Sequence, residues 1–278
     1  MQFSKLHGTG NDFIVVDARD KERDWSALAR VMCRRRFGVG ADGLILVQDS
    51  KVANLGMRMF NPDGSEAEAC GNGLRCFVKH AIERRMVARS ALTVETLSGV
   101  RNAVARVSEG EVAHVEISMG LPRFQPELIP IETATDEIPI LDYPLDVGDE
   151  KLALCLLSMG NPHAVSFQFE PVAGFPLNRV GPLVENHSLF PQRTNFEVAR
   201  TLSRGRVEAR VWERGVGETL ACGSGACAIA VAGHLLGYVD KEVDIMLPGG
   251  VLTVSWDGVG ELVLGGSVEE VFTGQYLD

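Results

Sequence analysis

One pattern occurs twice in this chain of 278 residues and constrains its fold more than any other feature. The two copies are Ala69–Cys76 and Ala221–Ala228, and in each a cysteine, Cys70 or Cys222, directly precedes Gly-x-Gly. Apolar residues at helical spacing follow both copies, which predicts that each cysteine lies at the start of a helix. The chain is therefore expected to contain two similar helix starts, 152 residues apart.

Such a helix start has a defined chemistry. The small residues after the cysteine allow a tight turn, and the first N–H groups of a helix have no partner within it. The positive end of the helix dipole is expected to lower the pKa of a thiol placed there. The same N–H groups can bind a carboxylate. The candidate carboxylate ligands are Gly71 and Asn72 in the first copy, and Gly223 and Ser224 in the second.

Further matches share nearly the same offset along the chain. Gly10-Asn11 matches Gly160-Asn161, residues 42–46 match 194–198, Phe60 matches Trp212, and Gly99-Val100 matches Gly250-Val251. Four matches in register predict a tandem duplication, and at this length they predict two similar α+β domains. Two copies packed face to face would bring both cysteines toward one ligand site between the domains.

The proline-rich stretch between residues 120 and 150 is the best place to divide the chain. We interpret it as a linker with an irregular extension, which assigns residues 1–119 to an N-terminal half and 120–267 to a C-terminal half. Within the first half the pattern predicts two strands in 1–17, a helix over 25–36, strands at 44–47 and 55–60, a helix from Cys70 to about Arg85, and strands at 92–97, 100–107 and 112–118.

Charge and composition exclude several classes of function. The net charge of −10 argues against a nucleic-acid binder, and the clusters Arg34–Arg36 and Arg84-Arg85 are expected on solvated helix faces. Neither a signal peptide nor an apolar stretch long enough to span a membrane is visible, so we expect a cytoplasmic protein with reduced cysteines. None of the six cysteines forms a Cys-x-x-Cys pair, so we expect no metal.

Two thiols that face a carbon acid from opposite sides can remove a proton from one face and return one to the other. The result is racemisation or epimerisation. Amino-acid chemistry of this kind often uses pyridoxal bound to a lysine. The six lysines of this chain (5, 21, 51, 79, 151 and 241) are in no phosphate-binding context. We therefore expect no cofactor, with the helix starts binding the α-carboxylate and stabilising the charge that develops at Cα.

Five segments in order resemble the diaminopimelate epimerase family over nearly the whole chain. They are Gly8–Phe13, Asn61–Cys76, Gly160–Val165, Arg193–Asn195, and Trp212–Gly215 continuing to Cys222–Gly225. The resemblance implies a cofactor-independent isomerase that interconverts LL- and meso-diaminopimelate in lysine and peptidoglycan biosynthesis. It also implies two pseudo-symmetric α+β domains, each a curved sheet around a central helix, with the last strand (about 268–278) returning to the first domain.

The resemblance also assigns roles to residues. Cys70 and Cys222 are the two acid–bases, and Cys70 takes the proton from the LL isomer. His163 and Glu213 resemble side chains that tune the thiols. The positions that resemble ligands of the distal amino-acid group are Asn11, Asn61, Asn161, Asn195, Glu213 and Arg214. The implied partners are the small-molecule substrate diaminopimelate and a second copy of the chain in a homodimer. Gly43 departs from the family, many members of which have Gln there.

Other interpretations stay open. A proline or hydroxyproline racemase of the same fold would use the same cysteine pair with a different pocket. Isomerases of the phenazine-biosynthesis type share the fold but lack the cysteine pair. A non-enzymatic thiol switch could oxidise the same two cysteines to a disulfide. The remaining cysteines, Cys33, Cys76, Cys155 and Cys227, are expected to be inert core residues.

Overall fold

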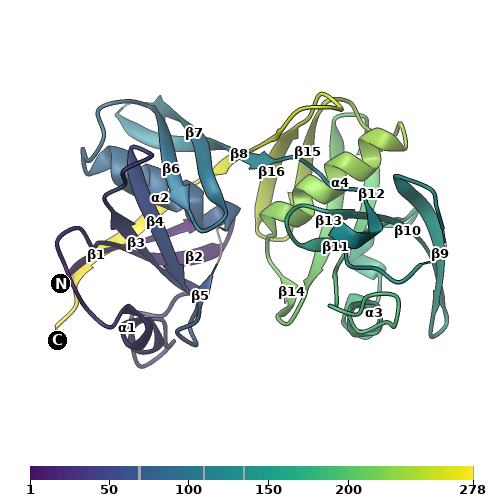
Figure 1. Ribbon diagram of the computed structural model, residues 1–278, viewed down its shortest axis with the longest axis horizontal. Helices are drawn as coiled ribbons and strands as arrows, with labels where there is room; N and C mark the ends of the chain where they lie inside the picture. The colour runs from purple at the N-terminus through teal and green to yellow at the C-terminus, as the bar shows by residue number, and fades with distance from the viewer. Residues whose placement is uncertain (68–69, 109, 134, 278) are drawn as a thin grey trace. The chain divides into compact units, whose positions relative to one another are not determined.

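The computed structural model describes residues 1–67, 70–108, 110–133 and 135–277 (Figure 1). The chain forms two compact units. The N-terminal unit contains Met1–Ser118 and Gly265–Asp278, and the C-terminal unit contains Met119–Leu264. Two strands continue across these boundaries, β8 (Glu111–Gly120) and β17 (Leu262–Ser267). The end of the chain thus belongs to the same unit as its beginning.

The N-terminal unit is built from strands around one central helix. Its other elements are β1 (Gln2–Gly8), β2 (Asn11–Asp17), α1 (Trp25–Met32), β3 (Gly43–Gln48), β4 (Leu55–Phe60), β5 (Glu66–Ala67), α2 (Gly71–Glu83), β6 (Ala91–Thr96), β7 (Gly99–Ser108) and β18 (Glu269–Gln275). The last strand, β18, pairs antiparallel with β1.

The C-terminal unit follows the same plan. Its elements are the 3₁₀ turns η1 (Pro126–Leu128) and η2 (Val172–Gly174), the helices α3 (Leu177–Glu185) and α4 (Gly223–Leu235), and the strands β9 (Ile140–Val147), β10 (Glu150–Ser158), β11 (Pro162–Phe167), β12 (Asn195–Ser203), β13 (Arg206–Glu213), β14 (Gly217–Thr219), β15 (Glu242–Leu247) and β16 (Gly250–Ser255).

Strand pairing repeats between the two units. β2 runs parallel to β3 as β11 does to β12, and β3 pairs antiparallel with β4 as β12 does with β13. The registers also correspond, because Phe13 lies opposite Gly43 and His163 lies opposite Asn195. Both units then form a hairpin, β6–β7 and β15–β16. The α+β fold and the internal repeat expected from the sequence are confirmed.

The helices α2 and α4 are enclosed by the strands of their own units. α2 contacts β1, β2, β3 and β7, and α4 contacts β10, β11, β12, β15 and β16. In Figure 1, α4 crosses the strands of the C-terminal unit. α4 carries small apolar residues on all sides, as a helix surrounded by core requires. Cys76 and Cys227, within these helices, are fully buried, as expected.

Two local expectations are wrong. Residues 140–147 are not irregular but form β9, with Pro144 opposite Ala153 of β10. Buried Ile140, Leu145 and Val147 hold this strand against the core, which outweighs the proline signal. The first helix ends at Met32 rather than Arg36, because a turn returns the chain so that the N–H of Gly40 donates to the carbonyl of Met32.

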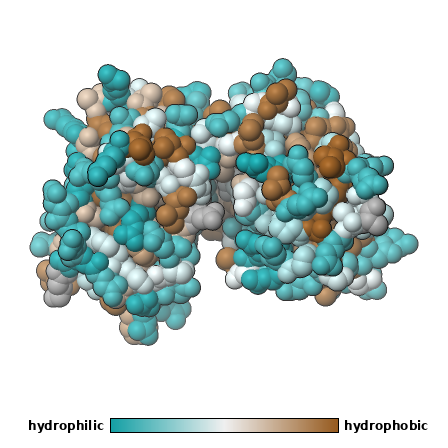
Figure 2. Space-filling model, viewed as in Figure 1, coloured by the Kyte–Doolittle hydropathy of each residue, from teal (hydrophilic) through white to brown (hydrophobic). Residues whose placement is uncertain are grey.

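Hydrophilic side chains cover most of each unit on the face that Figure 2 shows, and apolar ones lie between them in small groups. No helix within the described ranges is long and apolar enough to cross a membrane.

Candidate active site

The first thiol lies at the N-terminus of α2. Cys70 is the N-cap residue of this helix and is half-buried, with extended backbone angles (φ −102°, ψ 127°). Its Sγ donates to Oδ1 of Asn11 at 3.7 Å, and Nδ2 of Asn72 donates to the same oxygen at 3.4 Å. The fold thus brings Asn11, Cys70 and Asn72 together at one helix start.

Asp42 fixes the orientation of Asn11. Nδ2 of Asn11 donates to Oδ2 of Asp42 at 2.7 Å, which leaves the amide oxygen facing Cys70. Arg35 in turn binds Oδ1 of Asp42 at 2.8 Å and Asp12 at 2.6 Å. Arg35 is therefore part of an ion-pair network rather than only a solvated side chain. Burial opposes ionisation of Asp12, but hydrogen bonds from Arg35 and Lys5 lower its pKa to about 2.

Asn61 and Gly43 complete the predicted set in this unit. Asn61 lies in the turn after β4, and its Nδ2 donates to Oγ of Ser65 at 3.0 Å. A Cβ at Gly43 would lie 3.1 Å from the carbonyl oxygen of Phe60 and 3.2 Å from Cε of Met59. The backbone at Gly43 is closely packed, so a larger side chain there would require its neighbours to shift.

The second thiol lies at the N-terminus of α4. Cys222 is the N-cap residue and is 5% exposed, and its Sγ accepts from the N–H of Gly225 at 3.4 Å. Oγ of Ser224 lies 3.5 Å from the same sulfur. Burial raises the pKa of Cys222 well above its ordinary value, and Glu213 raises it further, against the lowering effect of the Ser224 hydrogen bond. The expected lowering of the thiol pKa is wrong for Cys222, because burial outweighs the helix start.

A chain of hydrogen bonds connects Cys222 with the core of its unit. Nδ2 of Asn161 donates to Oγ of Ser224 at 3.3 Å, and Oδ1 of Asn161 lies 3.0 Å from Nε2 of His163. Nδ1 of His163 lies 2.7 Å from Oε1 of Glu197. His163 and Glu197 are both fully buried. Burial raises the pKa of Glu197, while His163 lowers it.

Glu197 and Asp42 were not among the site residues expected from the sequence. A carboxylate within the buried apolar strand Phe196–Ala199 was the available signal for Glu197, because a buried charge without a partner is costly. Asp42 follows a glycine-rich turn and gave no local signal, since its partner Asn11 is 31 residues away.

The loop that carries Glu213 and Arg214 is held by Asn195. Asn195 is 3% exposed, its Oδ1 accepts from the N–H of Arg214 at 2.9 Å, and its Nδ2 donates to the carbonyl of Pro162 at 2.9 Å. Glu213 accepts a hydrogen bond from Oγ1 of Thr219 at 2.6 Å, and Nη1 of Arg214 donates to the carbonyl of Gln192 at 3.1 Å. Asn195 thus uses both ends of its amide on the backbone that positions Arg214.

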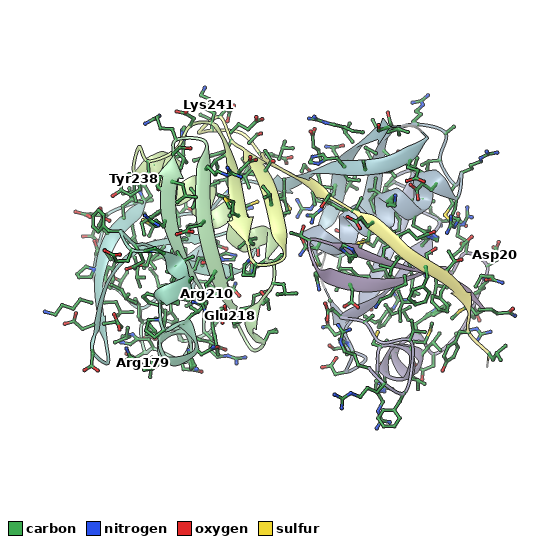
Figure 3. All side chains as sticks on the ribbon, turned by 180° about the vertical axis from the view of Figure 1, so that it is seen from behind. Asp20, Arg179, Arg210, Glu218, Tyr238 and Lys241 are labelled. Carbon is green, nitrogen blue, oxygen red and sulfur yellow. The ribbon has the colours of Figure 1, made fainter. Side chains whose placement is uncertain are left out.

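The strand that leads to Cys222 is anchored by a two-pronged ion pair. Arg210 of β13 binds Glu218 of β14 through Nε at 2.7 Å and Nη2 at 2.9 Å. These two residues lie side by side in Figure 3. Nη1 of Arg210 also donates to the carbonyl oxygens of Val172 and Phe175. A bidentate pair fixes orientation as well as distance. The pair therefore holds β14, and with it the segment that leads to the start of α4, in one position.

No group of three or more His, Cys, Asp or Glu side chains that could hold a metal ion occurs among the residues that the structure describes.

Comparison with solved structures defines the class of fold. The chain matches a hydroxyproline epimerase from Agrobacterium vitis with a TM-score of 0.73 at 16% identity, over 99% of this chain and 90% of that one. It matches a phenazine biosynthesis protein from Bacillus anthracis equally well, with a TM-score of 0.73 at 18% identity, over 100% and 99% of the two chains. The fold is thus one that epimerases share with phenazine biosynthesis proteins.

Sequence comparison identifies the family. The family model described as diaminopimelate epimerase matches residues 3–125 and 155–271. The diaminopimelate epimerase of Moorella thermoacetica is 48% identical over 99% of both chains, and that of Methanococcus maripaludis is 42% identical over 99% of both. The chain belongs to the diaminopimelate epimerase family. It is an isomerase that acts on a small molecule.

Proposed function

We propose that this enzyme interconverts LL- and meso-diaminopimelate, with Cys70 and Cys222 as its two acid–bases. The observation that carries the proposal is the repetition of one arrangement. In each unit a cysteine is the N-cap of a buried helix, and an asparagine from a hairpin earlier in that unit lies beside the helix start. Membership of the diaminopimelate epimerase family supplies the substrate.

The proposed reaction moves one proton at each face of Cα. The thiolate of one cysteine takes the Cα proton and becomes a thiol, and the electron pair of the broken C–H bond remains on the substrate. The thiol of the other cysteine then donates its proton to the opposite face and becomes a thiolate. The N–H groups at the starts of α2 and α4 bind the carboxylate on which the negative charge develops.

The high pKa of Cys222 favours a resting enzyme in which this cysteine is a thiol. That state suits the direction in which Cys70 is the base and Cys222 is the acid. For the reverse direction Cys222 must ionise, and the hydrogen bonds from Gly225 and Ser224 stabilise its thiolate.

Recognition of the distal amino-acid group is assigned to polar side chains of both units. We propose that Arg214 binds the distal carboxylate in a two-pronged contact, and that Glu213 and Asn11, Asn61 and Asn161 bind the remaining polar atoms. Asn195 contributes by holding the loop that carries Arg214. Proline has no distal amino-acid group for these side chains to bind, which disfavours a proline racemase.

We further propose that the reaction needs neither pyridoxal phosphate nor a metal. Activity should survive dialysis against a chelator and treatment with a carbonyl reagent, and it should be lost on alkylation of the thiols. Activity that is lost with the metal and restored by adding it back would contradict the proposal.

The deciding experiment is exchange of the substrate Cα proton with solvent deuterium. Incubation of LL-diaminopimelate in D₂O should give meso product labelled at one carbon, because the donating thiol has equilibrated with solvent. A thiol switch would give no exchange. A racemase of the proline type would exchange proline faster than diaminopimelate.

We also propose a homodimer and a cytoplasmic location. The exposed apolar side chains Val271 and Phe272 of β18 favour a partner on this strand, and Phe272 already packs edge-to-face on Phe3. All six cysteines are free thiols, which favours a reducing compartment. Sedimentation equilibrium of the wild-type protein and of Phe272→Glu tests the dimer, which the charged variant should weaken.

A further inference from the structure

The two units differ beneath their helix starts. A Cβ at Gly73 would lie 3.1 Å from Cδ1 of Ile45, and a Cβ at Gly225 would lie 2.9 Å from Oε1 of Glu197. Ile45 and Glu197 therefore occupy corresponding places, one below each cysteine-capped helix. Phe13 and His163 also occupy corresponding places, because Phe13 pairs with Gly43 and His163 pairs with Asn195 in the two equivalent strand pairs. The N-terminal unit thus has an apolar pair where the C-terminal unit has a buried glutamate and histidine.

In the hydrogen bonds that connect the His163–Glu197 pair with Asn161 and Ser224, the donor and the acceptor are fixed at each step. Nδ2 of Asn161 donates to Oγ of Ser224, so Oδ1 of Asn161 faces Nε2 of His163. An amide oxygen only accepts, so Nε2 must carry a proton. The remaining proton of the pair then lies between Nδ1 of His163 and Oε1 of Glu197, which are 2.7 Å apart. With one shared proton the pair has no net charge, which suits its full burial.

At its other end, this chain of hydrogen bonds reaches Sγ of Cys222. Because Oγ of Ser224 accepts from Asn161, its own hydrogen is available to Sγ of Cys222, 3.5 Å away. The N–H of Gly225 donates to the same sulfur. Both donors stabilise a thiolate on an otherwise buried cysteine. Loss of the partner at Nδ1 would free His163 to take the other tautomer, in which Nε2 accepts a hydrogen bond. The Asn161 amide would then reverse to donate to Nε2, and the Ser224 hydroxyl would donate to Asn161 instead of to the sulfur.

We propose that Glu197 is a positioning residue for Cys222: by sharing a proton with Nδ1 of His163 it keeps Nε2 protonated and directs the Asn161–Ser224 chain so that Ser224 donates to the sulfur. The proposal rests on the proposed function only in taking Cys222 as an acid–base. It makes the two thiols unequal, since Cys70 has Ile45 and Phe13 in the corresponding places.

The test measures ionisation of Cys222 without substrate. In the full-length protein, the rate of iodoacetamide alkylation of Cys222 is followed against pH by mass spectrometry of its peptide. Glu197→Ile, which copies the N-terminal unit, removes the proton-sharing partner. It should raise the alkylation midpoint by about one pH unit, which is tenfold less thiolate at a given pH. Glu197→Gln can donate its amide hydrogen to Nδ1, so its midpoint should stay near that of the wild type.

Controls separate positioning from charge and from folding. If Glu197 acted only as a negative charge, both variants would lower the midpoint; if it were only structural, neither would move it. Either result overturns the proposal. It is also overturned if the midpoint of Glu197→Gln rises as much as that of Glu197→Ile. The double variant His163→Phe/Glu197→Ile leaves no buried polar atom of the pair unpaired and should also raise the midpoint. Glu208→Gln and Glu208→Ile, at a half-buried glutamate bound to Arg200, should leave it unchanged.

Turnover gives a second readout. Glu197→Ile should lower kcat with little change in KM in the direction that uses Cys222 as the base, and Glu197→Gln should restore most of it. A lack of turnover of diaminopimelate by the wild type would contradict the proposed function, yet the alkylation result would still decide the role of Glu197.

Discussion

Asp42 holds the amide of Asn11 through a hydrogen bond of 2.7 Å and so turns the amide oxygen toward the thiol of Cys70. Asp42→Ala removes this restraint, and we expect kcat/KM to fall about tenfold to a hundredfold, a loss of roughly 1.4–3 kcal/mol in transition-state binding. Steady-state epimerisation measures it. Asp49→Ala, at an exposed position on the same unit, is the matched control. Equal activity of the two variants would contradict the role of Asp42.

Each thiol is expected to be indispensable. Cys70→Ala and Cys222→Ala should abolish epimerisation, because each face of Cα needs its own acid–base. The corresponding serine variants should retain a trace, since a hydroxyl is a far weaker acid. Cys155→Ala, at a buried cysteine of the C-terminal unit, is the control and should keep its activity. Full activity of Cys222→Ala would exclude the two-base mechanism.

Arg214 is expected to decide the choice of substrate. Arg214→Lys should sharply weaken use of diaminopimelate while the fold is kept, because an ammonium cannot imitate the two-pronged guanidinium contact. Turnover of LL-diaminopimelate, glutamate, aspartate and proline is compared side by side. Arg204→Lys, at an exposed arginine paired with Asp240, is the control. A wild-type preference for any of the three shorter amino acids would overturn the substrate assignment.

Buried thiols predict a loss of stability at alkaline pH. Burial raises the pKa of Cys33 and Cys76 to about 12 and that of Cys155 to about 11, from 9.0. Below pH 9 these thiols are protonated in both states, so the full stability is present. As the pH rises from 9 toward 11–12 the unfolded chain ionises first, and each thiol lowers the free energy of unfolding by up to about 1.4 kcal/mol per pH unit. Denaturant unfolding between pH 8 and 11 should show this decline, less steeply in Cys155→Ala. A flat profile would contradict it.

Local sequence patterns predicted much of the fold. The helix starts at Cys70 and Cys222 depend on a cap, two glycines and an apolar period within a few residues, and they appear where the sequence placed them. The strand β9 was missed because the prolines between residues 122 and 144 gave the stronger local signal, while its pairing with β10 and the burial of its apolar residues are tertiary effects.

The sequence by itself determined the duplication, the two cysteine-capped helices and the family, because each depends on short motifs and on their order along the chain. Only the tertiary structure decided the environments of those cysteines. The bond of Asn11 to Asp42 joins residues 31 apart, and that of His163 to Glu197 joins residues 34 apart. Burial then raised the pKa of Cys222 against the helix start. Hydrogen bonds between distant strands and desolvation depend on which residues fold together, and no local pattern specifies that.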